Sequence, residues 1–486
     1  MDSIPRSLSP TPHQKFKFSN EPTDYRLLQS FGERRDSCSL DDEDYITTIS
    51  FDRTGDYLAV GDRAGRLIFF KYIVASETFN FEEDSVMLES NRSSCKPHNL
   101  KYKRISSLDF SPKASGKANP VEYEYLYDFQ SHLKEFDYLK SEEIDQKINF
   151  VKWMHNNGSH MNVVSSNSKT IKLWRIREKF ARRKKNSEDN GMLNSSPRVS
   201  LDYEPTYKHT LKQEFFKLHK YALNSISLTK NDEFMLTSDD LKIYLWSLND
   251  CNKPYNVVNR TPFDMEELSE VITCSSLSKR NDNLFVFGTS KGMVNLVDTR
   301  IAGVCDKNCT EFKSKKIKEK ETTFFSDILG SISSCEFSQE EDLIIAREYL
   351  NLKVWDIKNT KEPVSIVPIF EDVKGHLCKL YENEGIFDKF RISMSRKRKM
   401  VLTGTYNDSF HLVNLNTCEN HQFRIMSNDE VTVQKMNNGK HGENENGGNG
   451  KKTPLNLKNK ILQAEFHPNK NCFALACLNC LYVFGI

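Results

Sequence analysis

The sequence lacks any apolar run of the roughly 18–20 residues that a membrane-spanning helix needs, which excludes an integral helical membrane protein. Its first residues, MDSIPRSLSPTPHQKFKF, are polar and rich in Pro and Ser, with no apolar core of a secretory signal. Twelve cysteines without such a signal predict free thiols in a reducing compartment. We therefore expect a cytoplasmic and nuclear protein.

The sequence also lacks an excess of either charge and any catalytic signature. With 69 Lys+Arg against 67 Asp+Glu, the net charge of +2 is far from the strongly basic balance of nucleic-acid-binding domains. No nucleophile elbow, phosphate-binding glycine loop or zinc-protease motif is present. Cys477 and Cys480 form a C-x-x-C, but no second pair completes a zinc site, so buried strand positions are the better interpretation. We expect no enzyme activity, cofactor, metal, nucleic-acid partner or membrane partner.

What the sequence does contain is one unit repeated along the chain. Each copy has a β-branched or aromatic strand, a polar turn, a strand of small and apolar residues, a second turn and a strand that ends in an aromatic. The seven copies span residues 45–72, 147–176, 222–248, 271–298, 331–357, 387–415 and 460–486.

These strands carry apolar residues on both faces, so each small sheet must be covered on both sides. Sheets placed radially around an axis satisfy this requirement, because each blade packs on its neighbours. Trp174, Trp246 and Trp355 end three copies, and Trp355 with Asp356 forms the WD dipeptide. The sequence predicts an all-β fold, a seven-bladed WD-repeat β-propeller; a β-sandwich with extra strands is the alternative.

The last copy has only three strands, so closing the ring requires a strand from elsewhere. We expect residues 15–18 (KFKF) to supply it within a propeller of residues 15–486, although a disordered tail is the alternative. Residues 1–14 and 20–40 are expected to be mobile tails. Long insertions are expected at 73–146, at 177–218 and at 416–458, the last being rich in Asn and Gly.

Acidic runs lie in loops next to the copies, at residues 41–44 (DDED), at Asp239 and Asp240, and around EFDY at 135–138. One interpretation is solvated loop charge. The other is a surface for a basic peptide, because a propeller presents its binding surface in such loops.

Longer strings resemble one family. FQSHLKEFDYLKSEEIDQKI, TSDDLKIYLW, MEELSEVIT, FFSDILGSISSCEFS and LCKLYENEGIFDKF closely resemble the WD-repeat regulatory B subunit of protein phosphatase 2A, and the resemblance runs from about residue 15 to the end. It implies a non-catalytic subunit that binds the HEAT-repeat scaffold subunit and the metal-dependent Ser/Thr catalytic subunit of that phosphatase. Homo-oligomers are not implied.

The resemblance also implies a β-hairpin arm at about residues 177–216 that binds the scaffold. We expect that replacing residues 178–214 leaves the propeller folded, and that Tyr203, Tyr207, Leu211 and Phe215 contact the scaffold. The segment FARRKKNSEDNGMLNSSP departs from the family, which puts scaffold contacts there in question.

The family's acidic groove on the top face recruits basic phosphoprotein substrates. Carboxylates there would steer basic chains, and Tyr221, Leu241, Leu268 and Phe387 would anchor them by apolar contact. The matching positions are Asp42, Arg63, Lys140, Tyr221, Asp240, Leu241, Leu268, Tyr381, Glu382, Phe387 and Lys389. Glu384, Gly385 and the Asn-rich insertion depart from the family.

A WD-repeat substrate receptor or scaffold of another complex, such as a ubiquitin ligase, is the alternative function, and an enzyme is a weaker one. The receptor would be expected to carry an adaptor-binding segment before the ring, which the sequence does not show.

Overall fold

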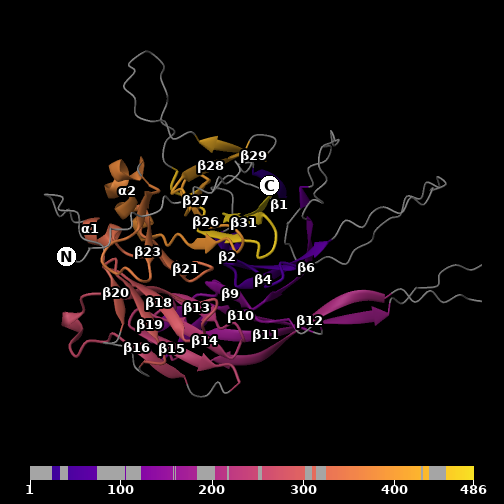
Figure 1. Ribbon diagram of the computed structural model, residues 1–486. Coiled ribbons are helices and arrows are strands. Elements are labelled where there is room, and N and C mark those ends of the chain that lie inside the picture. Colours follow the sequence, from indigo (N-terminus) through magenta and orange to yellow (C-terminus); the bar gives the residue numbers. More distant parts are fainter. Residues whose placement is uncertain are drawn as a thin grey trace, which may run out of the picture.

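The computed structural model describes residues 25–32, 42–73, 104–105, 122–156, 158, 160–182, 203–215, 218–249, 254–301, 309–313, 325–370, 372–427, 431–436 and 456–485. Seven antiparallel sheets are arranged around an axis, which confirms the predicted seven-bladed β-propeller (Figure 1). In each sheet the first strand is innermost, and hairpins lead outward from it.

The first four blades have four strands each, and their order in each sheet follows the chain. Blade 1 is β2 (Ile46–Phe51), β3 (Tyr57–Asp62), β4 (Arg66–Ile73) and β6 (Glu122–Gln130), and blade 2 is β9 (Phe150–Trp153), β10 (Met161–Ser166), β11 (Ile171–Arg182) and β12 (Tyr203–Phe215). Blade 3 is β13 (Ser225–Leu228), β14 (Phe234–Ser238), β15 (Lys242–Ser247) and β16 (Tyr255–Asn259), and blade 4 is β17 (Ile272–Leu277), β18 (Leu284–Thr289), β19 (Val294–Asp298) and β20 (Thr310–Phe312).

The later blades include two larger sheets. Blade 5 is β21 (Ser334–Phe337), β22 (Leu343–Arg347), β23 (Asn351–Asp356) and β24 (Ser365–Pro368), and blade 6 is β25 (Ile392–Met394), β26 (Met400–Gly404), β27 (Ser409–Asn414), β28 (Asn420–Ser427) and β29 (Val431–Met436). Blade 7 is β30 (Gln463–Phe466), β31 (Cys472–Cys477), β32 (Cys480–Gly485), β1 (Arg26–Phe31) and β5 (Arg104–Ile105).

Short elements lie in the connections between blades. β7 (Glu135–Asp137) and β8 (Glu142–Ile144) form a separate hairpin between blades 1 and 2. The helical elements are η1 (Asp42–Asp44), η2 (Met265–Glu267), α1 (Phe325–Leu329), η3 (Asp372–His376), α2 (Leu377–Glu382) and η4 (Gly385–Phe387).

The core lies between the blades. Seven clusters of buried apolar side chains are present, and each joins residues of two neighbouring blades, including the junction of blade 7 with blade 1. Strands such as β31 and β32 are buried along their whole length, because both of their faces are covered. Burial of apolar surface stabilises a fold by about 25 cal/mol per Å². In a closed ring every blade has two neighbours, so both faces of each sheet contribute buried apolar surface.

The two ends of the ring differ in what they carry. We call top face the end made by the segments that lead into the innermost strands and by the turns between second and third strands; the bottom face is the opposite end. At the top face the blades are joined by backbone bonds, such as those donated by Ile272 N to Asp240 O (2.8 Å) and by Ile461 N to Thr405 O (3.0 Å). Gly404 allows this approach, because a Cβ there would meet Ile461 O at 1.9 Å.

The ring is closed by β1, whose residues pair with β32 from Arg26↔Gly485 to Phe31↔Leu481. Residues 15–18, for which we predicted this role, lie outside the described residues. The outer position of blade 7 beside β32 belongs to a segment that we had expected to be part of a mobile tail at 20–40, so that expectation is corrected for Arg26–Phe31.

Two predicted insertion boundaries also change. The range 416–458 contains β28, the fourth strand of blade 6, and β29, which pairs with it. The hairpin of β11 and β12 runs from Ile171↔Phe215 to Arg182↔Tyr203, so its inner part is the outer edge of blade 2 and its outer part extends away from the ring. Figure 1 shows this hairpin projecting on the side opposite α1 and α2.

Candidate functional site

The residues predicted to bind substrate all lie in top-face connections, around the mouth of the central channel. Asp42 lies in η1, and Arg63 in the turn between β3 and β4. The others lie in the β7–β8 turn (Lys140), before β13 (Tyr221), in the β14–β15 turn (Asp240 and Leu241), after η2 (Leu268), in α2 (Tyr381 and Glu382), in η4 (Phe387) and before β25 (Lys389).

The two adjacent aspartates of the β14–β15 turn have different roles. Asp239 is buried, and its carboxylate accepts bonds from Leu241 N (2.9 Å), from Lys242 N (2.7 Å) and from His219 Nδ1 (3.0 Å). Burial alone would raise the pKa of Asp239, but these hydrogen bonds hold it below its usual value. Asp239 therefore builds the turn, and only half-buried Asp240 is available at the surface.

Asp240 is linked across the channel to Lys389 of another blade. Asn224 Nδ2 donates to Asp240 Oδ1 (2.7 Å), and Lys389 Nζ donates to Asn224 Oδ1 (2.7 Å). Asn224 also donates to Ile272 O (2.9 Å). One amide thus holds a carboxylate of blade 3 and an ammonium leading into blade 6, so two of the predicted residues are brought together by a residue that we did not predict.

A second group of charged residues lies in the top-face connections of blades 1, 2, 6 and 7. Lys460 Nζ lies 2.5 Å from Asp388 Oδ1, and Arg63 Nη1 lies 3.4 Å from Asp42 Oδ2. Burial and the neighbouring charge of Arg63 lower the pKa of Lys147, with a smaller effect of Lys460 in the same direction. The centre of the mouth therefore holds cations beside its few carboxylates.

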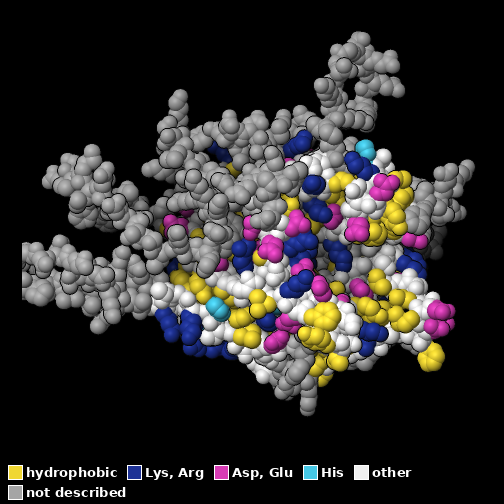
Figure 2. Space-filling model, turned by 180° about the vertical axis from the view of Figure 1, so that it is seen from behind, with side chains coloured by type: hydrophobic (Ala, Val, Ile, Leu, Met, Phe, Trp, Pro, Cys, Tyr) yellow, Lys and Arg dark blue, Asp and Glu magenta, His cyan; other side chains and the backbone are white. Residues whose placement is uncertain are grey.

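Carboxylates are more frequent toward the rim of the top face. Exposed acids lie in η1 (Asp42, Glu43), β8 (Glu142, Glu143), η2 (Glu266, Glu267) and α2 (Glu382). Several have cationic partners, such as Glu142 with Lys169 (3.4 Å) and Glu143 with Lys134 (2.9 Å). Figure 2 shows one side of the molecule, where Lys and Arg side chains are interspersed with Asp and Glu over the described surface.

The predicted apolar anchors divide into exposed and buried side chains. Phe387 and Tyr381 are 58% and 43% exposed, and their ring centroids lie 6.2 Å apart. Phe325 of α1, which we did not predict, lies 6.0 Å from Tyr381. Leu268 is half-buried, but Leu241 is only 3% exposed. The prediction of Leu241 as a surface anchor is corrected, because its side chain is buried.

Lys140 and Tyr221 lie on the blade 2 side of the mouth. Lys140 is exposed in the β7–β8 turn, where its backbone N donates to Asp137 Oδ1 (3.3 Å). Lys169 connects this hairpin to the segment before β13, because it pairs with Glu142 and donates to Lys220 O (2.9 Å), next to Tyr221. The same hairpin presents Tyr138 and Leu139, which are 86% and 98% exposed.

The predicted scaffold-binding residues are not all on the arm surface. Leu211 is 46% exposed, and half-buried Tyr207 donates from its hydroxyl to Glu178 Oε1 (3.1 Å). Phe215 is 1% exposed, because it pairs with Ile171 and packs in the cluster between blades 2 and 3. It cannot contact a partner, so this prediction is corrected. The side chain of Tyr203 lies outside the described residues.

Sequence reasoning missed Asn224, Lys147, Asp388 and Lys460. All of them directly precede an innermost strand, in the segments that make the top face. A search of the first few residues of each repeated copy would have found them. Among the residues that the structure describes, no group of three or more His, Cys, Asp or Glu could hold a metal ion, and no helix is long and apolar enough to cross a membrane.

Comparison with known proteins gives relatives along nearly the whole chain. No family model matches the sequence. The chain is 32% identical over 462 residues to "Protein phosphatase PP2A 55 kDa regulatory subunit" of Drosophila melanogaster, covering 91% of this chain and 83% of that one. It is 32% identical to the regulatory B subunit of protein phosphatase PP2A from Schizosaccharomyces pombe (95% and 97% covered) and to the gamma isoform of the human 55 kDa regulatory B subunit of serine/threonine-protein phosphatase 2A (96% and 98% covered).

Proposed function

Because the chain belongs to the family of 55 kDa regulatory B subunits of protein phosphatase 2A, we propose that it joins the scaffold and catalytic subunits and recruits their phosphoserine and phosphothreonine substrates. The family is one of regulatory rather than catalytic subunits. Similarity over nearly the full length of both chains is the observation that carries the proposal, because it includes the connections as well as the blades.

The top face is the proposed substrate surface. Rim carboxylates such as Glu43, Glu266 and Glu382 have no ion pair among the described residues, so their charge is available to attract a basic chain. Tyr381 and Phe387 offer aromatic area beside them, and such side chains provide most of the affinity where they become desolvated. A basic substrate segment with apolar residues fits this combination.

The outer part of the β11–β12 hairpin is the proposed scaffold contact. Beyond Arg177↔Lys208 the pair projects from blade 2 and carries half-buried Tyr207, whereas exposed Leu211 lies on the inner part, where it pairs with Trp174. Projecting strands can reach a partner without disturbing the ring, because the packing of the blades lies at their inner end. We place the resulting complex in the cytoplasm and the nucleus, which imaging of a tagged chain at native expression would test.

Co-purification tests the proposal most directly. A tagged full-length chain should recover a HEAT-repeat scaffold and a Ser/Thr phosphatase catalytic subunit in equal amounts. A variant in which residues 178–207, which include the projecting pairs, are replaced by a short Gly/Ser linker should recover much less of both. Recovery of an E3 ligase adaptor in place of these subunits would instead support the alternative, a substrate receptor of a ubiquitin ligase.

A further inference from the structure

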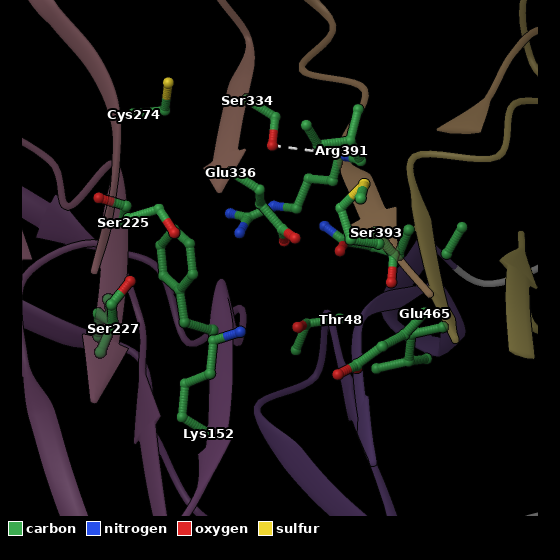
Figure 3. Close-up of a pocket in the computed structure, with 18 of the residues that line it drawn as sticks. Thr48, Lys152, Ser225, Ser227, Cys274, Ser334, Glu336, Arg391, Ser393 and Glu465 are labelled. Carbon is green, nitrogen blue, oxygen red and sulfur yellow. Dashed lines mark hydrogen bonds between the residues drawn. The ribbon is translucent and has the colours of Figure 1, made fainter. Parts of the chain in front are cut away.

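The central channel opens at the bottom face into a pocket that the proposed function does not use. A cavity of about 210 Å³ lies within the channel and is lined by innermost strands. A second one of about 490 Å³ lies at its bottom mouth, between the ends of these strands and the turns that follow them. Figure 3 shows Lys152, Arg391, Glu336 and Glu465 pointing into the space between strands of different blades.

Cations outnumber carboxylates in the lining of these two cavities. The cations come from five blades, and the carboxylates are Asp52, Glu336 and Glu465. Asp52 is committed to its own turn, where it accepts bonds from Gly55 N (2.7 Å) and Tyr57 N (3.0 Å). The cationic lining residues are Arg53, Lys152, Lys230, Lys279, Arg280, Arg391 and Arg396.

Only two of these seven cations are neutralised by an ion pair. Lys279 lies 3.4 Å from Glu336, and Arg53 pairs with Asp232. Among the described residues the other five, namely Lys152, Lys230, Arg280, Arg391 and Arg396, have no carboxylate within ion-pair distance. Arg391 lies instead over the ring of Phe150, 4.3 Å from its centroid, and Arg396 donates to Arg53 O (3.3 Å).

Burial of the lining residues increases the positive excess of the channel lining. Burial raises the pKa of Glu465 to about 7, although Lys152 opposes the shift, and burial lowers the pKa of Arg391 to about 10. At neutral pH the arginine stays charged while Glu465 is only partly ionised, which adds to the positive excess. Convergent like charges inside a low-dielectric wall produce a focused field that attracts the opposite charge.

We propose that this bottom-face pocket binds a small polyanion that carries several phosphate groups. Its volume lies within the roughly 300–1,000 Å³ of small-molecule sites, and guanidinium and ammonium groups converge on it from several directions. A phosphate cluster on a compact scaffold matches that arrangement. An acidic peptide fits less well, because the site is a mouth bounded by turns of several blades rather than a groove along a surface.

Calorimetric titration of the full-length chain tests this, with inositol hexakisphosphate and inorganic tripolyphosphate as probes and inorganic phosphate and a Glu-rich peptide as comparisons. Both polyphosphates should bind more tightly than phosphate or the peptide. The tighter of these two polyphosphates indicates whether the ligand is an inositol phosphate or an inorganic polyphosphate. Lys152→Gln with Arg396→Gln should weaken binding at least about tenfold. Glu465→Gln should tighten it about threefold, because it removes a negative charge and keeps the oxygen that accepts from Phe51 N.

The matched control is Lys358→Gln with Lys361→Gln. It removes the same charge from exposed positions on the bottom face, between β23 and β24, and should leave binding unchanged. Thermal melts of all variants without ligand show whether each one is folded. The proposal is overturned if the wild type binds neither polyphosphate below about 1 mM, if the control weakens binding as much as the pocket variant, or if the peptide binds as tightly.

Discussion

The two mouths of the central channel carry similar side chains that are used differently. At the centre of the top mouth opposite charges are brought together: Asp240 and Lys389 share Asn224, and Asp388 pairs with Lys460. At the bottom mouth Lys152, Arg396 and others have no carboxylate partner among the described residues. Paired charges fix the loops that present a surface, whereas unpaired ones leave free energy that a ligand can use.

The arm, which is the β11–β12 hairpin, projects from the bottom face. Two deletions of different length within it should differ in their effect on folding, and the longer one gives the largest expected effect. Replacing residues 178–214, which we first expected to leave the propeller folded and to weaken scaffold binding, removes most of β12, including the stretch from Lys208 that pairs with β11 inside blade 2. It also removes His209, which stacks on Phe129 at 4.2 Å. We expect a loss of more than about 4 kcal/mol or no folded protein.

Replacing residues 178–207 removes only the projecting pairs and leaves those from Ile171↔Phe215 to Arg177↔Lys208 in place. This shorter deletion should melt like the wild type and bind the scaffold less well in a pull-down. If both deletion variants melt like the wild type, the inner half of β12 is not needed for the stability of blade 2. If the shorter one binds scaffold fully, the contact lies elsewhere.

The second effect separates structure from surface within the top face. Asp239→Ala should destabilise the fold by about 3 kcal/mol, because it leaves His219 and two turn N–H groups without their buried acceptor. Chemical denaturation measures this. Asp240→Ala, as the neighbouring control, should cost less than about 1 kcal/mol. Equal losses would show that both carboxylates are structural.

The third effect concerns binding at the paired mouth. Asp240→Lys should weaken a basic substrate peptide at least about tenfold at low salt, because attraction becomes repulsion. Asp240→Asn keeps the oxygen that accepts from Asn224, so it should lose only about threefold. Titrations at low and high salt, with assembly of the phosphatase checked in parallel, give both values. Wild-type affinity in Asp240→Lys at low salt would remove this carboxylate from the recognition surface.

The last effect is a pH dependence of stability that comes from Glu465 in the channel lining. The pKa of Glu465 is raised from 4.5 to about 7, so between these values the folded chain holds a proton that the unfolded chain releases. Stability should therefore fall as the pH rises from about 4.5 to 7, by roughly 1–3 kcal/mol. Denaturation curves of the wild type and Glu465→Gln across this range should differ in slope, and parallel curves would contradict the shift.

The blades could be predicted because each copy carries its own strand and turn pattern within about 30 residues. The closing strand could not be predicted, because β1 pairs with β32, about 450 residues away, and nothing in the sequence RLLQSF identifies that partner. Phe215 and Leu241 show a second limit: an alternating or turn pattern does not reveal where a continuous strand passes from exposed to buried. Asn224 was missed because the sequence places it in a connection like many others, and only the ring brings Lys389 to it.

The pairing of β1 with β32 has a consequence for how the protein is made. About 450 residues separate the two strands, so β1 leaves the ribosome well before β32 has been made. At about 5–20 residues per second, the first strand waits roughly 20–90 s for its partner. During that time its edge lacks β32, so the cell must keep it from pairing with other chains until β32 has been made.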